Sequence, residues 1–351
     1  MSRTIEVKTG KPYRIHVGAG LLETAGGLMT AVHAPGRIAV VTDSNVANLH
    51  FPALAEVLNS AGFEPLLYVF PAGEASKTLS TYEGILQFLA ENRFTRTDVV
   101  IALGGGVTGD LTGFAAATYL RGIRFVQIPT TLLAMVDSSV GGKTGVDLPS
   151  GKNLVGAFHQ PSLVICDTKV TATLPSEVFV DGVAEALKTA VLKDANLFGL
   201  MEQGDWSTHL DDVIATCIRI KAEVVEADEF EQGERKLLNL GHTLGHAIEK
   251  CSNYTVSHGH AVAMGLAAVT RAAVANGLAT QELSDRISNA LQNNGLPVSF
   301  PFPMEELLPA IASDKKRAGS KLTLVVPLTI GKCTLLELPL PEAQEFLRKG
   351  V

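Results

Sequence analysis

Cysteine, aromatic residues and long apolar runs are scarce in this sequence of 351 residues. Its four cysteines lie far apart and form no C-x-x-C pair, which argues against a disulfide framework and against a thiolate zinc site. The N-terminus lacks a basic segment followed by an apolar run, and no stretch approaches about 18 consecutive apolar residues. We therefore expect a cytoplasmic protein without an export signal and without a membrane partner.

An excess of positive charge is absent as well. The chain has 29 lysine and arginine residues against 36 aspartate and glutamate residues, and its net charge of −7 argues against a nucleic-acid partner. Hydrophobic residues make up 46% of the chain, with 33 glycines and one tryptophan, so its composition suits closely packed helices rather than a large aromatic core. The length suggests two domains.

Short apolar runs alternate with helical patterns in the first half of the chain. The runs cover residues 38–42, 66–70, 99–103, 125–128 and 163–166. A strand that is buried on both faces and followed by a helix is the unit of an α/β fold, so we predict a parallel sheet of about five or six strands. Residues 4–17 alternate around Gly10-Lys11-Pro12, which predicts a hairpin at one edge of that sheet.

The pattern changes at Thr173-Leu174-Pro175, after which helical patterns continue almost without a break to about residue 312. We predict an α/β nucleotide-binding domain with a mostly parallel sheet in residues 1–174 and a mainly α-helical domain in residues 175–351. Within the second domain, residues 261–275 are rich in alanine and apolar nearly all round, which predicts a central helix. Residues 321–338 predict a second hairpin.

A glycine-rich turn follows the predicted strand 99–103. Glycines at positions 104, 106 and 109 fit the pattern G-x-G-x-x-G between a strand and a helix, where backbone N–H groups and the helix dipole can bind a pyrophosphate. The ordinary dinucleotide fingerprint opens the first strand–helix unit, whereas this turn comes later. We therefore predict a nucleotide-binding sheet with a non-standard order; glycines that only turn the chain are the alternative.

Residues 136–153 are rich in glycine, serine, threonine and lysine. Loops at the carboxyl ends of parallel strands are where such folds bind ligands, so we predict anion contacts from Lys143 and Lys152. Solvated lysines are the alternative. Lys221 lies on the apolar stripe of a predicted helix, where a lysine is costly unless it meets an anion; an ammonium that reaches solvent at the edge of the stripe is the alternative.

Residues 235–248 predict a single α-helix, because apolar residues recur on one face at steps of three and four: Leu237, Leu240, Leu244 and Ile248. A second face carries four polar residues at similar steps, which indicates a lined site: Arg235, Asn239, His242 and His246. Two histidines one turn apart suit two imidazoles that share a metal or a substrate. Two helix histidines that are hydrogen-bonded to their neighbours are the alternative.

Further candidate ligands lie nearby in the sequence. His258 and His260 follow within twenty residues, and a helical stretch upstream carries Asp181, Glu185 and Lys188 at steps of four and three. A carboxylate with two or three imidazoles is typical of zinc sites.

Together these segments resemble the 3-dehydroquinate synthases, a family of sugar phosphate cyclases. The resemblance lies in Pro71–Lys77, Leu103–Gly113, Tyr119–Gly122, Pro129–Thr131, Asp137–Lys143, Gly151–Asn153, Ala184–Lys188, Leu237–His246 and His258–Gly259. It implies an N-terminal NAD-binding domain, a helical metal-binding C-terminal domain, an active site between them and a homodimer. Two positions depart from the family: His260 stands where glutamate is usual, and Thr108 where valine is common. His260 could compete for the metal or cap a helix.

The resemblance also implies residue roles. Glu185, His242 and His258 are expected to bind a zinc or cobalt ion, so that His246 faces the substrate instead. Expected NAD contacts are Asp43, Glu74, Lys77, Gly105, Gly106, Val107, Asp110, Thr130, Thr131, Asp137, Lys143, Lys152, Thr173 and Leu174. Expected catalytic or substrate contacts are Arg121, Lys143, Asn153, Lys188, Lys221, Arg235, Asn239, His246 and one of Lys315 and Lys316.

The implied reaction converts 3-deoxy-D-arabino-heptulosonate 7-phosphate to 3-dehydroquinate and phosphate, a step of the shikimate pathway to aromatic amino acids. It is an NAD- and metal-dependent carbon–oxygen lyase reaction: transient oxidation, phosphate elimination, re-reduction and aldol cyclisation. The alternatives are another sugar phosphate cyclase, a metal-dependent NAD-linked alcohol or glycerol dehydrogenase, and a non-catalytic NAD-binding regulator. The many cations at the expected site favour a phosphorylated sugar acid over an uncharged alcohol.

Overall fold

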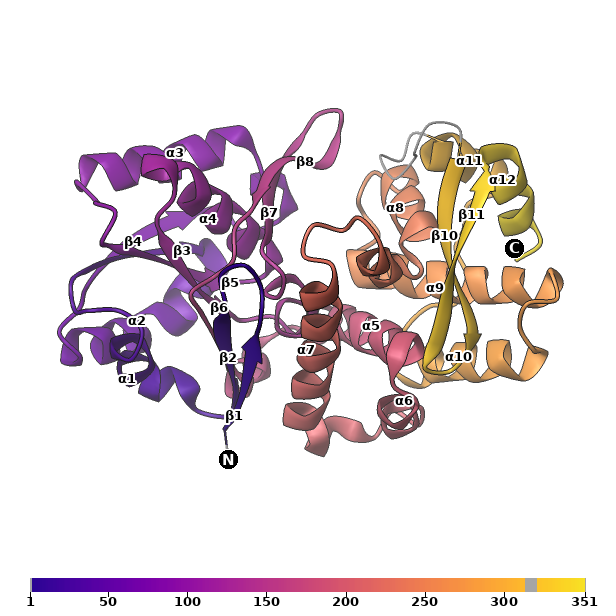
Figure 1. Ribbon diagram of the computed structural model, residues 1–351, viewed down its shortest axis with the longest axis horizontal. Helices are drawn as coiled ribbons and strands as arrows, with labels where there is room; N and C mark the ends of the chain where they lie inside the picture. The colour runs from indigo at the N-terminus through magenta and orange to yellow at the C-terminus, as the bar shows by residue number, and fades with distance from the viewer. Residues whose placement is uncertain (1, 313–320, 351) are drawn as a thin grey trace. The chain divides into compact units, whose positions relative to one another are not determined.

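The computed structural model describes residues 2–312 and 321–350, which fall into two compact units (Figure 1). The first unit comprises Met1–Pro175 and Lys221–Phe230, and the second comprises Ser176–Ile220 and Glu231–Val351. Helix α7 (Leu210–Ala227) therefore contributes to both units. The segment Lys221–Phe230, which the sequence placed in the helical domain, groups with the first unit.

Within the described residues, the first unit is built on a seven-stranded sheet with the order β1-β2-β9-β6-β5-β3-β4. Its strands are β1 (Arg3–Val7), β2 (Tyr13–Gly18), β3 (Arg37–Asp43), β4 (Glu64–Phe70), β5 (Val99–Gly104), β6 (Arg124–Pro129) and β9 (Leu163–Asp167). All neighbouring strands pair in parallel except β1 and β2, which form the predicted hairpin at an edge. The prediction of a mostly parallel sheet is confirmed.

Helices α1 (Ala25–Thr30), α2 (Ser44–Ser60), α3 (Leu79–Glu91) and α4 (Gly106–Thr118) connect or cover these strands. Asp43 begins α2, because its carboxylate accepts the backbone N–H groups of Asn45 and Val46. All six residues of β5 are buried, as expected for a central parallel strand. Phe114 of α4 and Phe125 of β6 belong to the apolar core between helices and sheet.

Residues 136–153, which we predicted as loops, are more ordered than expected. A π-helix covers Ala134–Ser138, and β7 (Lys143–Leu148) pairs with β8 (Gly151–Phe158) in a separate antiparallel hairpin. Gly145 and Gly156 allow these two strands to approach closely, since a Cβ on Gly156 would overlap the Thr144 carbonyl oxygen. The glycines that indicated loops therefore serve close strand pairing.

The second unit is mainly helical (Figure 1). Its helices are α5 (Ser176–Lys193), α6 (Ala195–Met201), α8 (His242–Cys251), α9 (His258–Ala275), α10 (Gln281–Asn293), α11 (Met304–Ala312) and α12 (Leu340–Arg348). Helix α9 is buried nearly all round, which confirms the predicted central helix. Strands β10 (Lys321–Thr329) and β11 (Lys332–Pro339) form the predicted second hairpin. Among the described residues, no helix is long and apolar enough to cross a membrane.

The single helix that we predicted for residues 235–248 is wrong in its first half. Residues Glu234–Asn239 form the 3₁₀ helix η7, and α8 begins only at His242. Between them, Gly241 has a left-handed φ of 78°. Gly241 lies so close to α9 that a Cβ there would come within 2.8 Å of the Val262 carbonyl oxygen. The apolar period continues across this break, so it gave no sign that Arg235 and Asn239 leave the helix of His242 and His246.

Candidate active site

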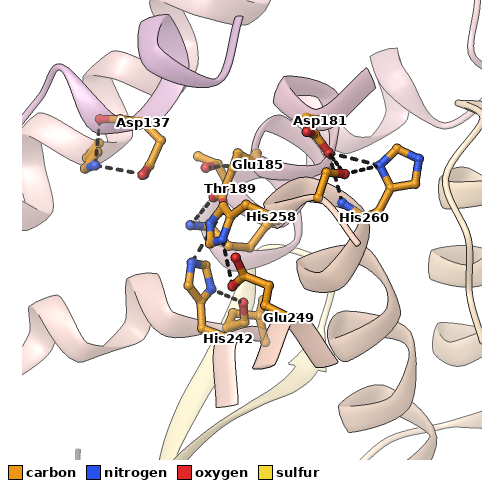
Figure 2. A network of polar contacts seen from close by, with 12 residues as sticks. Asp137, Asp181, Glu185, Thr189, His242, Glu249, His258 and His260 are labelled. Carbon is orange, nitrogen blue, oxygen red and sulfur yellow. Dashed lines mark hydrogen bonds and ion pairs between the residues drawn. The ribbon is translucent and has the colours of Figure 1, made fainter. Parts of the chain in front are cut away.

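Three helices of the second unit bring together the predicted metal ligands (Figure 2). Glu185 of α5 is fully buried, and its Oε1 lies 3.5 Å from His242 Nε2 and 3.3 Å from His258 Nε2. His242 is the first residue of α8, and His258 is the first residue of α9. One possible ligand atom from each of the three residues lies within 4.8 Å of the others. This spacing fits one shared divalent ion.

The other ring nitrogen of each histidine is already engaged. His242 Nδ1 lies 3.0 Å from the Leu240 carbonyl oxygen, and His258 Nδ1 lies 3.2 Å from Glu249 Oε2. A carbonyl oxygen only accepts hydrogen bonds, so His242 Nδ1 donates to Leu240. With both Nδ1 atoms engaged in this way, the two Nε2 atoms face Glu185, as the ligand atoms of metal-binding histidines would.

Glu185 is ionised despite its burial. Burial opposes ionisation, but the Lys188 ammonium and the His258 imidazole hold the pKa of the Glu185 carboxyl below its ordinary value. Lys188 is itself 1% exposed, and its Nζ lies 2.5 Å from Glu185 Oε2. Neither Glu185 oxygen accepts a hydrogen bond of good geometry from the described residues. The Nε2 atoms of His242 and His258 therefore face the Glu185 carboxylate in the way that three ligands of one cation face one another.

A second group of possible ligands shares His258. Atoms of His246, Glu249 and His258 also lie within 4.8 Å of one another. Neither group contains both His242 and His246, the pair that helical spacing suggested as sharing a metal. Glu249 was missed from the sequence, because its burial appears only in the structure, where it is 2% exposed.

His260 belongs to neither metal group among the described residues. Its Nδ1 lies 2.9 Å from Asp181 Oδ1, and the same oxygen accepts the His260 backbone N–H at 3.1 Å and the Ser257 hydroxyl at 2.6 Å. The hydrogen bond and charge of Asp181 raise the pKa of His260 above its ordinary value. Asp181 of α5, rather than the His260 side chain, caps the start of α9, because its carboxylate accepts the His260 backbone N–H (Figure 2).

Two further predicted residues of the second unit lie in η7. Arg235 is 1% exposed, and Asn239 donates from Nδ2 to Glu231 Oε1 at 2.9 Å. A buried guanidinium is costly without anionic company. With Lys188 it makes two buried cations in an acidic protein.

The glycine turn of the first unit has the predicted context. Strand β5 ends at Gly104, Gly105 is the N-cap residue, and α4 begins at Gly106 without a side-chain cap. Side chains would be crowded here, since a Cβ on Gly105 would lie 3.1 Å from Thr131 and one on Gly109 would lie 2.7 Å from Gln127 Oε1. The uncapped N–H groups and the helix dipole suit an anion such as a pyrophosphate. The hydroxyl of Thr130 is buried without a hydrogen-bond partner in the described residues.

Lys77 links three predicted residues beside this turn. It is 5% exposed, and its Nζ donates to Asp110 Oδ2 and to Asn153 Oδ1, each at 2.6 Å. Burial opposes its charge, but Asp110 and Glu74 raise the pKa of Lys77 above its ordinary value. Lys152 Nζ lies 3.1 Å from Glu74 Oε1. Asn153 has a left-handed φ of 54°.

Lys221 meets an anion, as its apolar stripe required. Its Nζ donates to the backbone oxygen of Asp137 at 2.7 Å and to Asp137 Oδ1 at 2.8 Å. Both residues belong to the first unit. The alternative interpretation, in which the Lys221 ammonium reaches solvent at the edge of the stripe, is therefore wrong, because Lys221 is 8% exposed.

The remaining predicted residues lie in several elements. Asp43 Oδ2 is 3.5 Å from the Thr108 hydroxyl, and the Thr173 hydroxyl is 3.1 Å from His50 Nε2. Leu174 follows the 3₁₀ helix Thr168–Thr173. Arg121 and Lys143 are exposed, and Arg121 has a φ of 68°. Lys315 and Lys316 lie outside the described residues.

Two family models match adjoining parts of the chain. The model described as the N-terminal part of 3-dehydroquinate synthase matches residues 67–181, and the model for the C-terminal part matches residues 182–317. The chain belongs to the 3-dehydroquinate synthase family. The family resemblance that the sequence motifs indicated is thereby confirmed, and the protein is an enzyme of that family.

Relatives and solved structures agree with this family. A 3-dehydroquinate synthase of Streptococcus thermophilus is 41% identical over 345 residues, covering 96% of this chain and 97% of the relative. One of Latilactobacillus sakei is 43% identical over 353 residues, covering 98% of each. The solved structure of 2-epi-5-epi-valiolone synthase from Streptomyces hygroscopicus, with NAD+ and Zn2+ bound, superposes with a TM-score of 0.87 at 29% identity over 96% of each chain.

Other structural neighbours show the fold alone. 2-Deoxy-scyllo-inosose synthase, in a complex with carbaglucose-6-phosphate, NAD+ and Co2+, has a TM-score of 0.89 at 24% identity, covering 99% of this chain and all of that one. An iron-containing alcohol dehydrogenase has a TM-score of 0.65 at 16% identity, covering 98% of each chain. Cyclases and dehydrogenases thus share this architecture, and site chemistry has to separate them.

Proposed function

We propose that this protein converts 3-deoxy-D-arabino-heptulosonate 7-phosphate to 3-dehydroquinate and phosphate, with NAD and a divalent metal as cofactors. The observation that carries the proposal is the converging group of Glu185, His242 and His258, with the buried Lys188 beside it. One carboxylate and two imidazoles leave room at a zinc or cobalt ion for a substrate oxygen. The 3-dehydroquinate synthases that match nearly the whole chain support the choice of substrate.

Each cofactor has its own part in this chemistry. When bound, NAD would supply reversible oxidation of a secondary alcohol, and the metal would supply Lewis acidity. Glu185, His242 and His258 would hold the ion. Lys188, 2.5 Å from Glu185 Oε2, is placed to donate to a negatively charged substrate oxygen next to that ion. His246, one turn from His242 on α8, would face the substrate and move a proton there.

The NAD site would be formed in the first unit around the start of α4. The uncapped helix start after β5 supports a pyrophosphate position there. The residues proposed to contact NAD are Asp43, Glu74, Lys77, Gly105, Gly106, Val107, Asp110, Thr130, Thr131, Asp137, Lys143, Lys152, Thr173 and Leu174.

The substrate would be held mainly by cations. Lys188 and Arg235 are each 1% exposed, and an uncharged alcohol would not engage their charges. A phosphate and a carboxylate would, through charge-assisted hydrogen bonds. The residues proposed to contact the substrate are Arg121, Lys143, Asn153, Lys188, Lys221, Arg235, Asn239, His246 and one of Lys315 and Lys316.

We propose further that residues 1–174 form the NAD-binding domain and residues 175–351 the metal- and substrate-binding domain of a homodimer. The resemblance to the family supports this arrangement. We place the enzyme in the cytoplasm. The absence of a disulfide among its four cysteines in the described residues supports this, since thiols persist in a reducing compartment.

One assay separates the candidate functions. The metal-loaded enzyme is mixed with the heptulosonate phosphate and with less NAD than substrate, and phosphate and reduced nicotinamide are followed together. We expect phosphate to exceed the amount of NAD while reduced nicotinamide does not accumulate, because each turnover regenerates the cofactor.

The rival functions give other results in this assay. Reduced cofactor that accumulates with glycerol, without phosphate release from the heptulosonate, would establish a dehydrogenase. Phosphate release from a different sugar phosphate alone would establish another cyclase, and NAD binding without turnover of any of these compounds would support a regulator. Arg235→Ala should weaken substrate binding far more than NAD binding. Arg286→Ala is the control, because Arg286 is bound to Glu202 at 2.8 Å and lies outside the proposed site.

A further inference from the structure

We propose that Glu249 is a positioning residue of the metal site, whose carboxylate fixes the ring of His258 so that Nε2 points at the ion. This inference rests on the proposed metal site of Glu185, His242 and His258. Glu249 would not touch the ion or the substrate. It would act through the hydrogen bond to His258 Nδ1.

The Glu249 carboxylate lies next to the His258 ring (Figure 2). Glu249 belongs to α8 and is 2% exposed, and its Oε2 lies 3.2 Å from His258 Nδ1. Its backbone is fixed as well, because its carbonyl oxygen accepts the Ser252 hydroxyl and the Tyr254 backbone N–H, each at 2.8 Å. A carboxylate is costly to bury without a hydrogen-bond partner, and the His258 imidazole provides one for Glu249.

The hydrogen bond determines what the far side of the ring can do. When Nδ1 donates to a carboxylate, Nε2 keeps its lone pair, and the ligand becomes more basic. His258 Nε2 then lies 3.3 Å from Glu185 Oε1. Without this acceptor the ring of His258 could turn or change its tautomer, because His258 begins α9 and no preceding helical turn restrains it.

The two histidine ligands are supported in different ways. His242 Nδ1 meets the main-chain oxygen of Leu240, which no substitution of Leu240 removes. His258 Nδ1 meets a side chain, so its support can be deleted by mutation. Glu249 is therefore the point at which the orientation of a ligand can be tested without changing a ligand.

A second carboxylate–histidine pair, whose histidine also lies on α9, offers a matched control. Asp181 Oδ1 lies 2.9 Å from His260 Nδ1, but His260 belongs to neither group of possible metal ligands in the described residues. Asp181→Asn removes one negative charge next to an imidazole of α9, as Glu249→Gln does. It also keeps an oxygen that can cap the helix.

The experiment measures metal binding by the full-length protein. Dissociation constants for Zn2+ and Co2+ are obtained by competition with a chelator for the wild type, Glu249→Gln and Asp181→Asn, together with the absorption spectrum of the Co2+ form. We expect one ion per chain in all three. Glu249→Gln should bind it about 10- to 100-fold more weakly, with shifted Co2+ bands, whereas Asp181→Asn should match the wild type.

Each other outcome decides against the inference. Unchanged affinity and an unchanged Co2+ spectrum in Glu249→Gln would overturn it, and equal weakening in both variants would show a general charge effect. A second ion bound by the wild type and lost in Glu249→Gln would make Glu249 a ligand with His246 instead. A wild type that binds no ion would refute the proposed metal site itself. If Glu249→Gln does not fold, Glu249→Asp, which withdraws the carboxylate by one methylene, should show the same weakening.

Discussion

Each unit buries a lysine beside a carboxylate, but the two surroundings differ. In the first unit, Lys77 Nζ is hydrogen-bonded to Asp110 and Asn153 at 2.6 Å each. In the second unit, Lys188 faces Glu185, and the Glu185 oxygens also face the Nε2 atoms of two histidines without well-aligned hydrogen bonds. The first cluster holds its own chain segments together, whereas the second presents several ligand atoms to one point.

The two clusters differ in whether the buried charges are hydrogen-bonded to one another. A buried ion pair stabilises little beyond what its desolvation costs, but removing one partner is strongly destabilising. Holding several ligand atoms close together costs free energy, and the binding of a cation offsets that cost. We therefore expect substitutions at the first cluster to lower the free energy of unfolding of the cofactor-free protein in addition to weakening NAD binding, and those at the second to act mainly on metal binding and turnover.

The largest effect is expected for Glu185→Gln. The amide lacks the charge that a divalent ion requires, so metal binding should be lost and turnover should fall by ~1000-fold or more. Metal content by elemental analysis and phosphate release measure the two effects. Chelation of the wild type should give the same loss, and added zinc or cobalt should reverse it. A Glu185→Gln protein that retained one ion per chain would remove Glu185 from the ligand set.

The next largest effect is expected for the two histidines of α8, His242 and His246, which we place in different roles. His242→Ala should abolish metal binding. His246→Ala should keep the ion and slow turnover about 100-fold or more, as the loss of a proton-transferring group does. Metal content and turnover number are measured for both variants. If His246→Ala lost the ion while His242→Ala kept it, the metal would lie in the group of His246, Glu249 and His258.

Lys77→Met tests the cluster of the first unit. It leaves the Asp110 carboxylate without its ammonium partner, so the free energy of unfolding in urea should fall by about 2–4 kcal/mol. Lys169→Met is the control, because Lys169 pairs with Glu23 at the surface and both side chains are more than half exposed. It should leave the unfolding curve unchanged. Equal curves for Lys77→Met and the wild type would show that the cluster of Lys77 does not stabilise the first unit.

The smallest expected effect is a pH dependence that differs between the units. Burial and the Arg124 guanidinium lower the pKa of His33 in the first unit from 6.5 to about 4. The unfolded chain therefore binds this proton first, and stability should be lost as the pH falls from about 6.5 towards about 4. His33→Gln should remove that part of the slope in urea unfolding followed over this range. An unchanged slope would show that His33 is not the group responsible.

His258 of the second unit should give the opposite sign in the metal-free protein. Burial lowers its pKa, but the neighbouring Glu185 and Glu249 carboxylates raise it to about 10. Its contribution to stability is therefore complete below about pH 6.5 and is lost as the pH rises towards about 10. Unfolding in the presence of a chelator, with His258→Gln for comparison, measures this loss. A slope of the same sign as that of His33 would contradict the ion pairs seen around His258.

The sequence by itself determined the features that depend on neighbouring residues. Buried apolar runs gave the parallel strands, and the glycine turn after β5 was identified because strand, turn and helix are adjacent in the chain. The alanine-rich α9 was likewise evident from its local composition. The family resemblance indicated Glu185, His242 and His258 together, and these are residues that the fold brings to one point.

Only the tertiary structure decided what depends on residues far apart in the sequence. Lys221 meets Asp137 across 84 residues, and no local pattern names that partner. The helix break at Gly241 follows from its close approach to α9, because the apolar period is the same on either side of the break. Glu249 looks like an ordinary helix glutamate until α9 brings His258 to within 3.2 Å of it. Periodicity records which face of a segment is buried, but packing alone selects the atoms that it is buried against.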